Sequence, residues 1–91
     1  MIRKRVVISG EVQGVYYRDT CRRLARDAGL GGWVRNRADR TVEAVFEGAP
    51  EQVDRLVAWT RQGPELAIVD DVAVFDETPE GLSGFDIRPT V

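Results

Sequence analysis

The chain contains no histidine. This absence excludes the commonest general base, most transition-metal sites and every Ser–His or Cys–His nucleophile pair. A single cysteine, Cys21, excludes an internal disulfide and fits a reducing compartment. Cys21 belongs to an apolar helical stripe, which favours a core thiol over a reactive one. We therefore expect neither a bound metal nor catalysis by cysteine.

Long apolar runs are also absent, and the basic N-terminus is not followed by the apolar core of a signal peptide. We expect a cytoplasmic protein without a membrane partner. The 91 residues are 43% hydrophobic and 31% charged, which is typical of one globular domain spanning residues 1–91.

Charge is distributed unevenly along the chain, although the net charge is only −2. Residues 1–40 contain ten Lys/Arg and four Asp/Glu, a net charge of +6, whereas residues 41–91 contain three and eleven, a net charge of −8. A positive first part favours an anionic ligand, and solvated surface charge is the alternative interpretation.

The hydrophobic pattern predicts five strands and two helices. The strands are expected at Arg3–Ser9, Trp33–Asn36, Thr41–Phe46, Ile68–Phe75 and Gly84–Arg88, and the helices at Arg18–Ala28 and from Pro50 to Gly63-Pro64. This order predicts an α+β, ferredoxin-like split βαβ sandwich, with two helices on one face of an antiparallel sheet of four to five strands. The fold decides no function, because enzymes, RNA binders and ligand-sensing modules share it.

The connection Gly10–Arg18, with the sequence GEVQGVYYR, leads from the first strand into the first helix. Its glycines allow a sharp turn with inward N–H groups, the helix adds a positive dipole end, and Arg18 adds a forked cation. These features predict a binding site for a small tetrahedral oxyanion, with a tight structural connection as the alternative. No Ser, Thr or Cys lies between Gly10 and Arg18, and Val12 stands where a cysteine phosphatase has its nucleophile, so water is the expected attacking group.

Asn36 is unexpected at the end of a predicted strand, because asparagine is a poor strand former. It either caps the turn with its side chain or orients a water molecule for in-line attack. Such a site lacks a general acid for the leaving group. A carboxylate with a pKa near 4 leaves without protonation, so the substrate is expected to be an acyl phosphate.

These residues resemble the acylphosphatase family over essentially the whole chain. The segment Gly10–Arg18 looks like its phosphate-loop signature, and the segment Gly32–Asn36, followed by Thr41-Val42 and Gly48, looks like its second signature. The resemblance implies hydrolysis of an acyl phosphate without metal or cofactor, Arg18 binding the phosphoryl group and Asn36 positioning the water. It further implies a phosphate site made by the backbone amides of Val12, Gln13, Gly14, Val15, Tyr16 and Tyr17. We expect a monomer that binds no nucleic acid.

Three residues depart from the family pattern. Arg40 occupies a hairpin position where the family usually has glycine, and a positive φ there would cost about 1 kcal/mol. Glu11 adds a negative charge that either faces solvent or weakens anion binding, and Glu65 follows Gly63-Pro64 where the family often has a second proline. Tyr16, Tyr17 and Trp33 are candidates for contacts with the acyl group, with core packing as the alternative for each.

Three other functions are possible on this fold. An RNA-recognition domain would have stacking aromatics on its central strands, but the first strand has none and the third only Phe46. A non-catalytic ligand-binding or regulatory module explains a glycine loop but not Arg18 together with Asn36. An acylphosphatase domain of a hydrogenase-maturation protein would be part of a longer, cysteine-rich chain, so the free enzyme is favoured.

Overall fold

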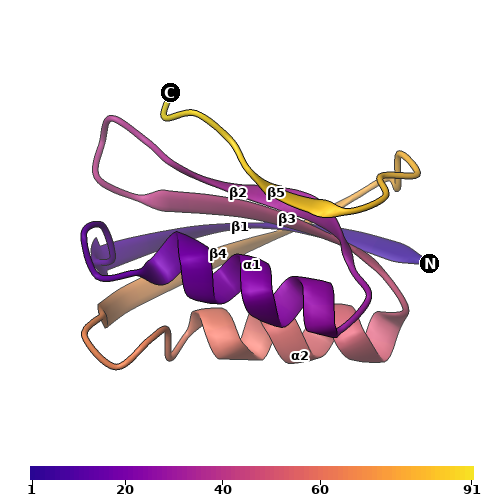
Figure 1. Ribbon diagram of the computed structural model, residues 1–91, viewed down its shortest axis with the longest axis horizontal. Helices are drawn as coiled ribbons and strands as arrows, with labels where there is room; N and C mark the ends of the chain where they lie inside the picture. The colour runs from indigo at the N-terminus through magenta and orange to yellow at the C-terminus, as the bar shows by residue number, and fades with distance from the viewer.

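A computed structural model describes residues 1–91, with five strands and two helices. The elements follow the order β1 (Ile2–Glu11), α1 (Tyr17–Asp27), β2 (Gly31–Asn36), β3 (Val42–Gly48), α2 (Pro50–Thr60), β4 (Ile68–Glu77) and β5 (Phe85–Ile87). The strands form one sheet in the order β4-β1-β3-β2-β5, and both helices cover the same face of it (Figure 1). The α+β ferredoxin-like arrangement is confirmed. None of the helices has the length and apolar character needed to span a bilayer.

The sheet differs from the predicted antiparallel one at a single pair of strands. Strand β3 pairs antiparallel with β1 and with β2, and β1 pairs antiparallel with β4. Strand β5 instead runs parallel to β2, with Val34 opposite Ile87. The chain enters β5 after a long connection that crosses one end of the sheet, which permits parallel pairing.

The boundaries of the elements agree with the pattern to within a few residues. The largest difference is at the end of α2, which was expected to reach Gly63 but ends at Thr60. Beyond Thr60 the chain forms a turn in which the N–H of Gly63 donates to the carbonyl of Trp59 at 2.9 Å. Gly63 has a φ of 69°, the left-handed conformation that ends a helical segment and that glycine adopts without strain.

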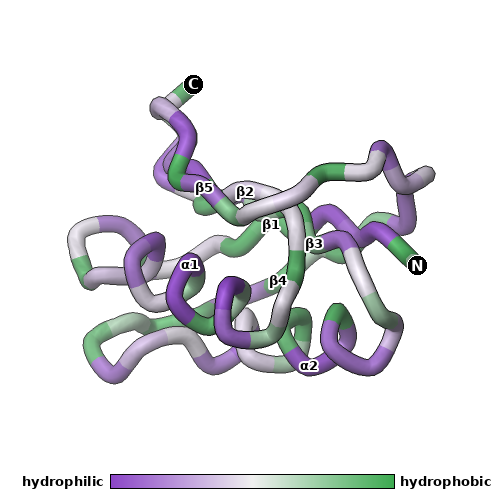
Figure 2. Tube along the Cα trace, turned by 45° about the vertical axis from the view of Figure 1, so that its right-hand side comes forward, coloured by the Kyte–Doolittle hydropathy of each residue, from purple (hydrophilic) through white to green (hydrophobic).

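The hydrophobic core lies between the sheet and the two helices. Alternate residues of β1 and β3 face the helices, among them Val6 and Ile8 on β1 and Phe46 on β3, all fully buried. Helix α1 contributes only a narrow apolar stripe, and most of its tube is hydrophilic in Figure 2. Cys21 lies on this stripe and is fully buried, as predicted, and burial raises the pKa of its thiol.

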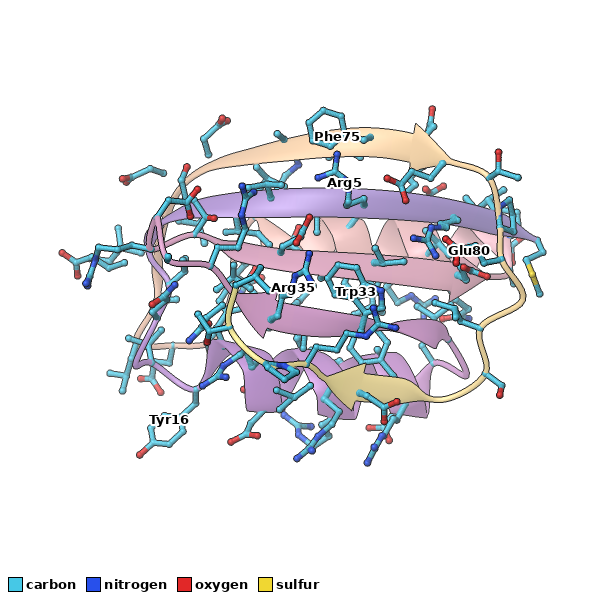
Figure 3. All side chains as sticks on the ribbon, turned by 90° about the horizontal axis from the view of Figure 1, so that it is seen from above. Arg5, Tyr16, Trp33, Arg35, Phe75 and Glu80 are labelled. Carbon is cyan, nitrogen blue, oxygen red and sulfur yellow. The ribbon has the colours of Figure 1, made fainter.

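The other face of the sheet, here called the open face, carries an ion-pair network. Arg3 bonds to Glu47 and to Glu77, each at 2.8 Å, and Arg35 bonds to Glu43 at 2.8 Å. The side chains of Arg5 and Arg35 lie beside aromatic rings on this face (Figure 3). Basic and acidic groups alternate here, so the open face neutralises its own charge.

Glu47 is the most deeply buried charge of the network, with 1% of its side chain exposed. Besides Arg3, it accepts hydrogen bonds from the backbone N–H groups of residues 80–82 at 3.0–3.2 Å. Burial alone would raise the pKa of this carboxyl, but these hydrogen bonds outweigh burial and hold the pKa below its usual value. Glu47 therefore attaches the connection between β4 and β5 to the sheet.

We expect Glu47→Gln to lower the free energy of unfolding at pH 7 by about 3 kcal/mol, because it leaves Arg3 without its buried partner. The pKa of Glu47 is lower in the folded than in the unfolded chain, so its contribution is complete above about pH 4.3 and disappears as the pH falls through the folded-state pKa. Urea unfolding at pH 7 and at pH 3 measures both effects. The gap between wild type and variant should narrow from pH 7 to pH 3, whereas exposed Glu65→Gln should show no gap at either pH. A gap of the same size at both pH values contradicts the role of the charge.

Candidate active site

The loop Val12–Tyr16, here called the 12–16 loop, connects β1 to α1. Gly14 and Tyr16 have positive φ values of 75° and 64°. Gln13, which precedes Gly14, and Val15, which lies between Gly14 and Tyr16, do not have positive φ values. Alternation of this kind turns successive backbone N–H groups toward a common concave side, the arrangement called an anion-binding nest. The predicted sharp turn is therefore present, but one of its left-handed residues is Tyr16 instead of a glycine.

Backbone donors of the 12–16 loop have no backbone partner. None of the five N–H groups from Val12 to Tyr16 donates to a backbone carbonyl. Tyr16 is also the N-cap of α1 and provides no side-chain hydrogen bond to the helix. The loop thus brings its unpaired donors to the positive end of the α1 dipole, where an anion is stabilised.

Neighbouring elements hold the loop in place. Val12 is buried in the core with 1% of its surface exposed. The Nε2 atom of Gln13 donates to two carbonyl oxygens of the hairpin between β2 and β3, those of Arg37 at 2.8 Å and Thr41 at 2.9 Å. Gly10 passes so close to β4 that a Cβ atom there would collide with the carbonyl oxygen of Ile68. The sequence assigned only a backbone amide to Gln13 and missed its side chain.

Arg18 lies in the first turn of α1 beside the 12–16 loop. It lines a surface cleft of about 390 Å³ together with Gly14, Tyr16, Asp19 and Ile87. Six other arginines form ion pairs within the chain, but Arg18 does not. Its forked guanidinium is therefore available to an anionic ligand.

Asn36 ends β2 at the same edge of the sheet as the loop. Asn36 and Ile8 both lie opposite Val42, from either side of β3. Strands β1 and β2 are both antiparallel to β3, so they run in the same direction and end at the same edge. The sheet register therefore brings Asn36 to the level at which the chain leaves β1 for the 12–16 loop.

The side chain of Asn36 is not used by the turn that follows it. Asp39 caps this turn, with its Oδ1 atom accepting from the N–H of Thr41 at 3.0 Å and from its hydroxyl at 2.6 Å. The Oδ1 atom of Asn36 is buried and accepts no hydrogen bond from the protein. A buried unpaired acceptor costs about 1–3 kcal/mol, and no donor of the chain offsets this cost. The capping interpretation of Asn36 finds no support here.

The three aromatic candidates for the acyl group have separate environments. Tyr17 is 2% exposed, and its hydroxyl donates to the carbonyl of Thr60 at 2.7 Å. Trp33 lies on the open face, where the guanidinium groups of Arg35 and Arg88 are 4.5 and 4.8 Å from its ring centre. Only Tyr16 lines the cleft with Arg18. Tyr17 and Trp33 therefore follow the alternative interpretation, as packing residues.

Two of the departures from the family pattern, Arg40 and Glu11, lie near the candidate site. Arg40 has a φ of 74°, so the hairpin keeps the left-handed conformation that was expected to strain a residue other than glycine. Glu11 is exposed at the end of β1, opposite Ile68. The uneven charge has a different cause from the one inferred, because Arg3, Arg5 and Arg35 of the basic part pair with carboxylates of the acidic part on the open face. Arg18 and Arg40 of the basic part form no such pair and line the clefts beside the 12–16 loop.

The whole chain is similar to known proteins. The sequence model of the acylphosphatase family matches residues 4–87. The chain belongs to the acylphosphatase family. It is 50% identical to an acylphosphatase of Gloeobacter violaceus over 94% of this chain and 92% of that protein, and 52% identical to one of Haloarcula marismortui over 94% of each. The crystal structure of acylphosphatase from Bacillus subtilis superposes with a TM-score of 0.93 at 32% identity, covering 97% of this chain and 99% of that one.

The acylphosphatase match includes the complete 12–16 loop, Arg18 and Asn36. It thus covers every residue that the sequence placed in the site. The structure also contains no group of three His, Cys, Asp or Glu side chains placed to hold a metal ion. The candidate site of this acylphosphatase is therefore built from backbone N–H groups, one free guanidinium and one unpaired amide oxygen.

We expect Gln13→Leu to weaken binding of inorganic phosphate about tenfold, because the 12–16 loop loses both hydrogen bonds to the hairpin and its N–H groups lose their common orientation. NMR titration of the loop amides with phosphate measures the affinity. Gln62→Leu, an exposed glutamine beyond α2, is the control and should bind phosphate like the wild type. Unchanged affinity of the Gln13 variant would show that the loop keeps its geometry without this side chain.

Proposed function

We propose that the protein hydrolyses acyl phosphates to a carboxylate and inorganic phosphate by direct in-line attack of water. Membership of the acylphosphatase family supports the overall activity. The observation that carries the mechanism is the unpaired, buried Oδ1 atom of Asn36 at the sheet edge where the 12–16 loop begins. The alternative is a non-catalytic ligand-binding or regulatory module with the same fold.

In this proposal the phosphoryl group is bound only by hydrogen-bond donors of the protein. The N–H groups of the 12–16 loop and of Tyr17 surround its oxygens, and Arg18 adds a charged, forked contact from the first turn of α1. Phosphoryl transfer has a loose transition state whose charge is spread over these oxygens. Fixed donors with no competing protein partner stabilise that charge without rearrangement of the site.

The attacking water is oriented by Asn36. In this proposal a rotation of the side-chain amide brings the unpaired Oδ1 atom to the water, where it accepts a hydrogen bond and a lone pair of the water oxygen is directed at phosphorus. Positioning of this kind replaces part of the entropy loss of a bimolecular reaction. The chain has no histidine to remove the water proton, and a phosphoryl oxygen of the substrate accepts it instead.

The leaving group sets the substrate class. The groups of the proposed site, which are backbone N–H groups, the guanidinium of Arg18 and the amide of Asn36, include no general acid that could protonate the leaving oxygen. A carboxylate leaves as an anion without protonation, but an alkoxide does not. The site is therefore suited to acyl phosphates and unsuited to phosphate monoesters.

All residues of the proposed site come from one chain, so the proposal includes a monomer and a single domain over residues 1–91. It places the protein in the cytoplasm, in keeping with its free, buried Cys21. It includes no nucleic-acid or membrane partner and no cofactor.

An assay of the purified protein on acetyl phosphate and benzoyl phosphate, with a metal chelator present, tests the proposal. We expect release of phosphate well above the uncatalysed rate, and we expect the chelator to leave this rate unchanged. Hydrolysis of p-nitrophenyl phosphate should be at least about 100-fold slower, because its phenolate leaving group is more basic than a carboxylate. Phosphate binding without turnover of either acyl phosphate would favour the ligand-binding module. Loss of activity with the chelator would contradict only the metal-free mechanism.

Two substitutions separate the proposed roles. Arg18→Ala should lower kcat/KM about 100-fold and weaken competitive inhibition by phosphate about tenfold or more, because a charged contact to the phosphoryl group is lost. Asn36→Ala should lower kcat about 100-fold and leave phosphate inhibition within about twofold of wild type, because it contacts only the water. Initial rates with and without phosphate measure both effects, and Arg23→Ala, an exposed arginine of α1, is the control. Equal loss of phosphate inhibition in both variants would rule out water positioning by Asn36.

A further inference from the structure

Tyr16 combines an exposed ring with an unfavourable backbone conformation. Its side chain is 71% exposed, and its φ of 64° is one that residues other than glycine, asparagine and aspartate rarely adopt. Its hydroxyl makes no hydrogen bond in the chain, and its ring is paired with no other aromatic ring. Packing therefore does not account for an aromatic residue here, and a glycine would form the same turn without strain.

The position of Tyr16 relates its ring to the phosphoryl site. Tyr16 lines the cleft of about 390 Å³ that also contains Arg18, and Ile87 of β5 forms another apolar part of the lining. Ile87 reaches this cleft because β5 runs parallel to β2 and ends at the same edge as Asn36. In Figure 3 the ring of Tyr16 projects into solvent from the end of the molecule, away from the open-face network.

We infer that Tyr16 is a specificity-determining residue that favours acyl phosphates with a flat, apolar acyl group. This inference rests on the proposed function. With the phosphoryl group held at Arg18, the acyl group extends into the cleft, and the Tyr16 ring and Ile87 provide its apolar surfaces. An aromatic acyl group stacks on the ring, whereas an acetyl group is too small to cover it.

Charge in the cleft limits the acyl group further. Asp19 is exposed in the same lining, and its carboxylate lies 3.4 Å from Arg22, which compensates part of its charge. An acyl group with its own carboxylate gains nothing from Tyr16 or Ile87 and is repelled by Asp19. The cleft therefore selects uncharged acyl groups.

The test compares benzoyl with acetyl phosphate in the wild type and in variants of Tyr16. Tyr16→Ala should lower the ratio of the two kcat/KM values about threefold to tenfold, mainly through a higher KM for benzoyl phosphate. Tyr16→Phe should keep the wild-type ratio. Tyr16→Asn should lower the ratio like alanine, because asparagine tolerates the left-handed backbone but has no ring. Phe75→Ala, which removes a half-exposed ring on the open face, should leave the ratio unchanged.

Binding of phenylphosphonate and methylphosphonate, followed by NMR, repeats the comparison without turnover. Wild type should bind phenylphosphonate more tightly, and Tyr16→Ala should lose this preference. If wild type hydrolyses neither acyl phosphate but shows the preference in binding, the proposed function fails and the role of Tyr16 stands. If Tyr16→Ala keeps the wild-type ratios, or if Tyr16→Asn restores them, Tyr16 acts through its backbone alone and the inference is overturned.

Discussion

The side-chain amide of Gln13 joins the two halves of the candidate site. The 12–16 loop holds the proposed phosphate donors, and the hairpin after β2 begins directly after Asn36. Two hydrogen bonds of 2.8 and 2.9 Å, from one nitrogen to two carbonyl oxygens, connect these segments across more than twenty residues of sequence. Without them, the loop and the hairpin would be related only through the sheet. An in-line reaction requires fixed distances between phosphorus, water and donors, and these bonds restrict the relative movement of the parts.

The open face of the sheet and the sheet edge near Arg18 differ in how their charges are paired. On the open face, arginines and glutamates neutralise one another, with Glu47 almost completely buried between Arg3 and the connection to β5. At the sheet edge, Arg18 has no ion-pair partner, and the loop donors have no backbone acceptor. An anion that approaches the molecule therefore finds the unpaired guanidinium of Arg18 and unpaired N–H donors at this edge, and a balanced surface on the open face. Because Arg18 has no competing carboxylate, its full charge is available to a ligand.

Local strain is concentrated at the same edge of the molecule. The only residues other than glycine with positive φ are Tyr16, in the loop, and Arg40, in the hairpin that Gln13 contacts. Conformations of this kind cost about 1–3 kcal/mol each and persist only where the surrounding structure imposes them. Core packing of Val12 and Tyr17 on either side of Tyr16 imposes the turn here. Tyr16 places an aromatic ring beside the proposed phosphoryl site, and Arg40 lines a second surface cleft together with Val12, Gln13 and Val15 of the loop.

Local features of this protein were determined by its sequence. The alternating and helical patterns of hydrophobic residues predicted the strands and helices, because such patterns involve only neighbours within a few residues. The helical pattern also predicted the buried stripe that contains Cys21. The glycines and Arg18 predicted an anion-binding loop for the same reason. Only the tertiary structure decided which side chains meet: that Asn36 keeps an unpaired oxygen, that Gln13 bridges loop and hairpin, and that the ring of Tyr16 reaches the cleft while that of Tyr17 is buried. These outcomes depend on strand register, on the parallel pairing of β5 with β2 and on contacts between distant segments. The ion pairs between the basic and the acidic part of the chain depend on the same tertiary contacts. No local pattern records such contacts, because the partners become neighbours only when the sheet forms.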